Sequence, residues 1–169
     1  MHRIYTIGYE ALDVSRFLAT LKDAGIEVLA DVRAVALSRK RGFSKTGLRD
    51  QLEASGIGYE HFIQLGNPKQ GRLAAREGHS FVRIYRRHLN SPESQDALKA
   101  LASLAKKNLT CLMCFERDPA TCHRSMIAAR LVSEGFATFH LFGDETTSHD
   151  GHREFLPGSR PGQSLAAAE

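Results

Sequence analysis

The chain has 169 residues, of which 42% are hydrophobic and 25% charged, and its formal net charge is +4. This composition is typical of a soluble globular protein and excludes a disordered or fibrous chain. Its apolar runs are shorter than the about 18 residues of a membrane span, and it opens without a secretory signal, so we expect a cytoplasmic protein with no membrane partner. Three cysteines, an odd number, favour free thiols over a disulfide framework. The positive charge favours an anionic partner.

The N-terminal segments predict a parallel strand–helix–strand unit. Residues 3–8, RIYTIG, are rich in β-branched and aromatic side chains and end in glycine, which favours a strand. Apolar residues at helical spacing follow Asp13, a suitable N-cap, and stop at Gly25. The apolar run 26–32 then predicts a strand that helices cover on both faces.

The middle of the chain has weaker patterns. A basic loop is expected over 33–45, a short amphipathic helix over 46–56 and a third strand over 57–65. Residues 66–80, GNPKQGRLAAREGHS, predict a long loop whose length favours a functional or mobile excursion. Residues 81–89 predict a short helix.

The best candidate for a central strand is the run 109–115, LTCLMCF, which is the most apolar run of the chain. A helix is expected before it, because Ser91 can cap a helix with Pro92 at its first position, and an apolar stripe follows up to Ala105.

After this strand, Asp118 can cap another helix with Pro119 at its first position, and the helical pattern ends near Gly135. A last strand is expected over 137–142, and the residues that follow predict a frayed tail.

Strands and helices that alternate at these spacings predict a single three-layer α/β/α domain on a mostly parallel, Rossmann-like sheet of about five strands. We assign it residues 1–143 and treat 144–169 as a C-terminal extension that is partly flexible. The chain has neither a GxGxxG fingerprint nor a P-loop, and we predict no cofactor.

Polar residues follow each predicted strand directly. Because the carboxyl ends of parallel strands share one edge of the sheet, where ligands bind, we expect these side chains to converge. The candidate binding residues are Tyr9, Arg33, Arg39, Lys40, His123 and Arg124. The candidate catalytic residues are Asp31, Glu116 and Cys122.

Cys122 is the thiol for which we predict reactivity. It lies near a predicted helix N-terminus, whose partial positive charge, together with Arg124 and His123, lowers the pKa of a thiol. The alternative is that Cys122 packs as a small apolar residue against the sheet. Cys111 and Cys114 have CxxC spacing, but residues three apart on a strand point to opposite faces, so we predict no metal site there and assign no metal ligand elsewhere in the chain.

Several motifs together resemble the domain of unknown function 488 family. They are YTIGYE, DVR, GFSK, LG and CFERDPATCHR, in this order between Ile4 and Leu141. The resemblance implies a compact α/β domain without an assigned reaction, and it marks ten positions. These are Gly8, Tyr9, Asp31, Arg33, Phe43, Cys114, Glu116, Cys122, His123 and Arg124.

Two functions of different class are compatible with these residues. The first is an enzyme, a hydrolase or transferase, whose Cys122, Glu116 or Asp31 acts on a phosphorylated or nucleotide-like substrate. The alternative is a non-catalytic module that binds nucleic acid or nucleotides through the basic loop. A third interpretation is a structural network of ion pairs. We favour the enzyme, because a binding module does not need a thiol and a carboxylate beside its arginines.

Overall fold

The computed structural model describes residues 1–143 and 153–154, and its centre is a sheet whose first five strands are parallel. The strand order is β3-β2-β4-β1-β5-β6, and the two-residue β6 pairs antiparallel with β5. The strands are β1 (His2–Gly8), β2 (Val28–Asp31), β3 (Gly58–His61), β4 (Thr110–Cys114), β5 (Phe136–Leu141) and β6 (Arg153–Glu154).

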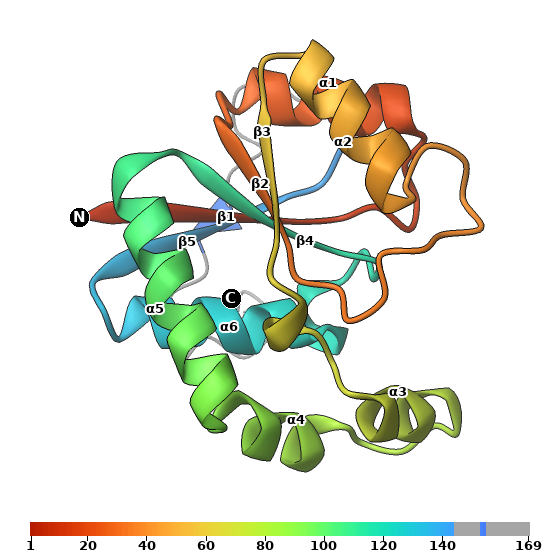
Figure 1. Ribbon diagram of the computed structural model, residues 1–169, viewed down its shortest axis with the longest axis vertical. Helices are drawn as coiled ribbons and strands as arrows, with labels where there is room; N and C mark the ends of the chain where they lie inside the picture. Colours follow the sequence, from red (N-terminus) through yellow and green to blue (C-terminus); the bar gives the residue numbers. More distant parts are fainter. Residues whose placement is uncertain (144–152, 155–169) are drawn as a thin grey trace, which may run out of the picture.

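Helices α1 (Val14–Asp23) and α2 (Lys45–Ala54) cover one face of the sheet (Figure 1). Asp13 caps α1 as predicted, since its carboxylate accepts a hydrogen bond of 2.7 Å from the Arg16 amide. The apolar stripes of both helices pack on side chains of β1, β2 and β4 and form one half of the core.

Helices α5 (Pro92–Lys107) and α6 (His123–Val132) cover the other face, and α4 (Val82–Leu89) packs against these two helices (Figure 1). Ser91 caps α5, and Pro92 is its first residue, as the sequence predicts. All five residues of β4 are buried, because helices lie above and below it.

The connections place β4 at a topological switch point. Chains that leave β1 and β2 cross on the face of α1 and α2, whereas the chain that leaves β4 crosses through α6 on the opposite face. Strand β4 lies between β1 and β2 in the sheet. The chain leaves β4 toward one face and leaves both of its neighbours toward the other face, so a crevice opens at the carboxyl end of β4. Cys114 is the last residue of this strand.

Two predictions in the middle of the chain are wrong in detail. The strand expected over 57–65 stops at His61, and Ile63–Leu65 form a 3₁₀ turn, η1. The loop expected over 66–80 contains a helix, α3 (Lys69–Arg76). Glycine at 71 lowers helix propensity, but it leaves room for the Asn67 side chain, since a Cβ there would lie 2.0 Å from Oδ1 of Asn67.

The start of α6 also differs from the prediction. Asp118 accepts a hydrogen bond from the Ala120 amide and caps a single 3₁₀ turn, η2 (Pro119–Thr121). The chain then becomes extended at Cys122, which is the N-cap of α6, and His123 is the first residue of the helix. This break turns Cys122 and His123 toward the end of β4.

The fold class is therefore confirmed: a single Rossmann-like α/β/α domain on a mostly parallel sheet. Among the helices that the structure describes, none has the length and apolar content that a membrane crossing requires. The predicted C-terminal extension, 144–169, lies outside the described residues except for β6.

Candidate functional site

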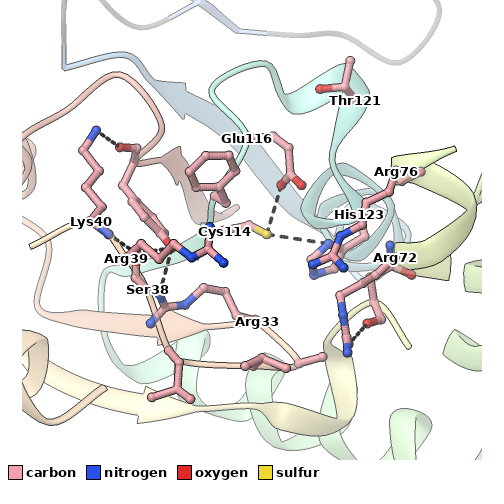
Figure 2. A pocket seen from close by; sticks show the side chains of 17 residues that line it. Arg33, Ser38, Arg39, Lys40, Arg72, Arg76, Cys114, Glu116, Thr121 and His123 are labelled. Carbon is pink, nitrogen blue, oxygen red and sulfur yellow. Dashed lines mark hydrogen bonds between the residues drawn. The ribbon is translucent and has the colours of Figure 1, made fainter. Parts of the chain in front are cut away.

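A cavity of about 910 Å³ lies at the carboxyl end of β4, in the crevice that the topology predicts (Figure 2). Its walls come from the end of β1, the basic loop after β2, helix α3 and the segment between β4 and α6. The charged and hydrogen-bonding side chains around it are Tyr9, Arg33, Ser38, Arg39, Lys40, Asn67, Arg72, Arg76, Cys114, Glu116, Thr121 and His123.

The floor of the cavity is formed by the chain that leaves β4, held against the end of β1. The Tyr9 amide donates to the carbonyl of Cys114 at 3.2 Å, and the Glu10 amide donates to that of Phe115 at 2.9 Å. Gly8 allows this close approach, because a Cβ at this position would lie 1.8 Å from the Glu116 carbonyl oxygen. These backbone hydrogen bonds continue the pairing of β1 with β4 beyond the ends of both strands, and they fix the backbone that leads into Glu116.

Arg124 fastens the same segment from below. Its guanidinium donates to the carbonyl oxygens of Glu116 and Arg117 and, through Nε, to Thr6 Oγ1 at 3.4 Å. The side chain is 1% exposed and does not line the cavity. The structure therefore gives this predicted anion-binding residue a positioning role under the cavity floor.

Cys114, Glu116 and His123 lie together at the base of the cavity (Figure 2). The Cys114 thiol donates to Glu116 Oε2 at 3.2 Å, and its sulfur lies 3.7 Å from His123 Nδ1. The Cys122 sulfur approaches the same ring nitrogen to 3.9 Å. Cys122 is buried behind this group and does not line the cavity, so Cys114 is the thiol nearer to a bound ligand.

A backbone contact determines which nitrogen of His123 faces the thiols. Nε2 lies 2.7 Å from the carbonyl oxygen of Val32, which can only accept, so Nε2 carries a hydrogen. In the neutral ring Nδ1 is then unprotonated, with its lone pair directed at Cys114 and Cys122. The end of β2 thereby prepares the imidazole to accept a proton or to bind an ion.

The two thiols titrate as a pair, because they share one environment. Burial opposes ionisation of Cys122, but its interactions with Cys114 and His123 outweigh this effect and lower the pKa of Cys122. The interaction with Cys122, followed by burial, raises the pKa of Cys114. Burial and the negative charge of Cys122 raise the pKa of Glu116.

Asp31 and Arg33 pair with each other at the end of β2. Nε and Nη2 of Arg33 donate to the two carboxylate oxygens of Asp31 at 2.9 and 2.6 Å. Tyr59 also donates to Asp31, at 2.7 Å, whereas Nη1 of Arg33 donates to Tyr9 Oη and to the Phe43 carbonyl. Asp31 is fully buried and does not line the cavity, while the guanidinium of Arg33 reaches its wall.

The upper walls of the cavity are basic. Arg39 and Lys40 lie on one side and Arg72 and Arg76 on the other, with Cys114 between them (Figure 2). The Lys40 ammonium donates to the carbonyls of the segment after β1, and Nη1 of Arg72 donates to the Asn67 carbonyl at 2.8 Å. These contacts fix the positions of the Lys40 and Arg72 side chains.

Six of the nine predicted site residues thus line one cavity: Tyr9, Arg33, Arg39, Lys40, Glu116 and His123. The other three, Asp31, Cys122 and Arg124, lie directly behind it. Arg72 and Arg76 were not predicted from the sequence, and Cys114 was marked by the family resemblance alone, without a role in the site. Arg72 and Arg76 are four residues apart, which places both side chains on one face of a helix. This spacing is informative only once residues 69–76 are known to form a helix.

A search of the curated proteins and a search of the solved structures found no match for this chain. A sequence model of the family described as domain of unknown function DUF488 matches residues 13–131, which is more than two thirds of the 169 residues. This confirms the resemblance carried by the DVR, GFSK and CFERDPATCHR motifs. The chain belongs to the DUF488 family.

Proposed function

We propose that this protein is an enzyme, a hydrolase or transferase, that acts on a small phosphorylated or nucleotide-like substrate. The observation that carries the proposal is the placement of a buried Cys114–Glu116–His123 centre at the base of a cavity with cationic walls. The buried free thiols suit a reducing compartment, so the proposal includes a cytoplasmic location.

The charge of the cavity supports an anionic substrate. Five cationic side chains line it, Arg33, Arg39, Lys40, Arg72 and Arg76. Asp31 neutralises Arg33. Among the described residues that line the cavity, Glu116 is the one with a carboxylate. Arginine is suited to this task, because its planar guanidinium can bind a phosphate through two parallel hydrogen bonds.

The size of the cavity supports a small molecule. A volume of about 910 Å³ lies in the range of roughly 300–1,000 Å³ that is common for ligand pockets. Exposed apolar side chains, Leu37 and Phe115, stand at its wall beside the cations. Such a wall can pack against the flat face of a base or another planar group.

The centre below supplies groups for proton transfer. In the proposed reaction the anion lies between Arg39 and Arg72, and the reacting bond lies over Cys114. Glu116 is the candidate general acid or base, because its carboxylate reaches the thiol and lines the cavity. His123 completes the centre, held in one orientation by Val32.

Binding measurements test the proposal. We expect a nucleoside monophosphate or diphosphate, or inorganic phosphate, to bind one site per chain in isothermal titration calorimetry. The double variant Arg72→Ala/Arg76→Ala should weaken this binding about tenfold or more, which corresponds to about 1.4 kcal/mol or more. The matched control is Arg83→Ala/Arg87→Ala, which removes the same charge from an exposed face of α4 outside the cavity.

The compounds that bind are then tested as substrates. Turnover of a bound compound should fall by a factor of roughly a hundred or more in Glu116→Gln, with binding retained. If both arginine pairs weaken binding equally, and only polynucleotides bind with a steep salt dependence, the protein is the nucleic-acid module of the alternative prediction.

A further inference from the structure

We propose that Cys114, Cys122 and His123 bind one divalent metal ion of the zinc class, with a fourth coordination position open to the cavity. Nothing in the linear spacing indicates this site, since its donors come from the end of β4 and from the N-terminus of α6. The metal site itself does not depend on the proposed function.

The three donor atoms already lie at the corners of a coordination triangle. His123 Nδ1 is 3.7 Å from the Cys114 sulfur and 3.9 Å from the Cys122 sulfur, and all three donors lie within 4.8 Å of one another. Zinc–sulfur bonds of about 2.3 Å and a zinc–nitrogen bond of about 2.0–2.1 Å in a tetrahedron separate S and N by about 3.6 Å and two sulfurs by about 3.8 Å. Small side-chain movements complete the site.

The orientation of His123 is the one that a metal ligand needs. Donation from Nε2 to the Val32 carbonyl fixes the tautomer in which Nδ1 presents its lone pair to the sulfurs. Metal-binding histidines commonly make this type of contact through their other nitrogen, which orients the ring and raises its basicity.

Hydrogen bonds use the donor atoms of this group only in part. The Cys114 thiol donates its one hydrogen to Glu116, and Nδ1 of a neutral His123 can accept from Cys122, so the lone pairs of both sulfurs remain available to a metal ion. Cys114, Cys122 and His123 are 5%, 1% and 4% exposed, so a thiolate among them is costly without a compensating charge. One divalent ion uses all three donors together and neutralises two thiolates.

The surroundings indicate a site with an open position. Two of the ligands, Cys114 and His123, line the cavity, and Glu116 stands beside them. Three protein ligands and a free fourth position characterise catalytic rather than structural zinc sites. The Cys114–Cys122–His123 set also differs from the CxxC pair, because Cys111 packs with the α1 and α2 side of the core while Cys114 packs on the other face.

The metal would decide the chemistry of the proposed reaction, and this consequence does rest on the proposed function. A metal held by these residues would supply an activated water as the nucleophile in place of a thiolate. The water oxygen would form the new bond to phosphorus as the bond from phosphorus to the leaving group breaks, and the water proton would pass to Glu116 and from there to the leaving group. The reaction is then a hydrolysis.

Cobalt and zinc titrations of the tag-free protein, reduced with a phosphine, test the site. We expect one Co²⁺ per chain, with the strong visible absorption of a tetrahedral ion and a thiolate-to-cobalt charge-transfer band in the near ultraviolet. Zn²⁺ should displace the cobalt. Cys114→Ala and Cys122→Ala should weaken metal binding by roughly a hundredfold or more. Cys111→Ala is the matched control and should retain both the stoichiometry and the spectrum.

A second measurement covers variants that fold poorly. Zn²⁺ should raise the Tm of the wild-type protein and of Cys111→Ala, because the metal binds the folded state, and it should not raise the Tm of His123→Gln. The proposal is overturned if the reduced wild-type protein binds no metal at micromolar concentrations. It is also overturned if cobalt gives an octahedral spectrum without the thiolate band, or if Cys114→Ala binds as well as Cys111→Ala.

The two proposals can fail separately. A protein that binds nucleotides through Arg72 and Arg76 but gives no thiolate–cobalt spectrum loses the metal site and keeps the anion site. A protein that binds cobalt through its thiols but no phosphate-bearing compound keeps the metal site and loses the proposed function.

Discussion

The carbonyl oxygen of Glu116 occupies the space in which any side chain on Gly8 would have to stand, 1.8 Å from an ideal Cβ. This contact joins the end of β1 to the segment that carries Glu116 and leads on to His123. It explains why the motif YTIGYE, at a distance of more than a hundred residues, is part of the same site.

Gly8→Ala should therefore destabilise the protein and displace the cavity floor. A clash with backbone cannot be relieved by a side-chain rotation, so we expect a loss of roughly 2–4 kcal/mol in the free energy of unfolding. Urea unfolding measures it. The control is Gly47→Ala in α2, where a Cβ meets nothing within 4 Å, and which should gain about 0.5–1 kcal/mol from helix propensity. Equal stability of the two variants would contradict the role of Gly8.

Arg124→Met should lower the free energy of unfolding by about 2–4 kcal/mol, because the carbonyls of Glu116 and Arg117 lose their buried donors. We expect Arg124→Lys to recover part of the loss, since an ammonium cannot reach both carbonyls in the same geometry. Unfolding by denaturant measures both variants. If Arg124→Met unfolds like the wild type but no longer binds phosphate, then Arg124 contacts the ligand directly, as the sequence predicted.

Asp31→Asn should cost about 3 kcal/mol of stability, because it leaves the buried guanidinium of Arg33 without its charged partner. Tyr59→Phe removes a single hydrogen bond to the same carboxylate and should cost about 1 kcal/mol. This graded pair of losses, measured by chemical unfolding, is what a structural ion pair predicts. A stable Asp31→Asn variant that lacks turnover would instead identify Asp31 as a catalytic residue.

Stability should fall as the pH drops from 7 to 5, and His140 should be one cause. Burial, followed by the positive charge of Arg124, lowers the pKa of His140 from 6.5 to about 4, while Asp118 acts weakly in the opposite direction. The unfolded chain therefore binds a proton near pH 6.5 that the folded chain binds only near pH 4. The folded state is disfavoured in this interval by about 1 kcal/mol, after allowance for solvent screening.

A hydrogen-bonded chain that links His140 to Arg124 also favours the neutral ring. The Thr6 hydroxyl accepts from Nε of Arg124 and lies 2.7 Å from Nδ1 of His140. The hydroxyl can donate to a neutral ring, but a protonated ring has no lone pair to accept that hydrogen. His140→Gln should flatten the dependence of stability on pH between 7 and 5. The matched control, His79→Gln, alters an exposed histidine and should leave the dependence unchanged.

The fold was predictable because its strongest signals are local. The apolar strands, the caps at Asp13 and Ser91 and the glycine stops each act within a few residues, and all of them point to alternating strands and helices. The segment 69–76 was not predictable in this way. Its flanking glycines and charges resemble a loop, and the contacts that hold α3, such as that of Arg72 with Asn67, form only in the folded chain.

The candidate site was likewise predictable only in part. The polar residues that follow each strand could be predicted, because parallel strands deliver their carboxyl ends to one edge. The sequence could not predict which of these residues face the cavity, because the burial of each side chain decides this. Asp31 and Arg124 are turned inward by Arg33 and by two backbone carbonyls, whereas Cys114, expected as a plain strand residue, faces the cavity.

By itself the sequence determined the order of the elements apart from η1 and α3, the sheet edge that carries the polar groups and the family of the chain, because hydrophobic periodicity, caps and contiguous motifs are properties of neighbouring residues. Only the tertiary structure decided that the last residue of β4 and the first residues of α6 bring two thiols and an imidazole within 4.8 Å of one another. Pairwise distances across a sheet depend on strand order and crossover direction, and no local pattern encodes them.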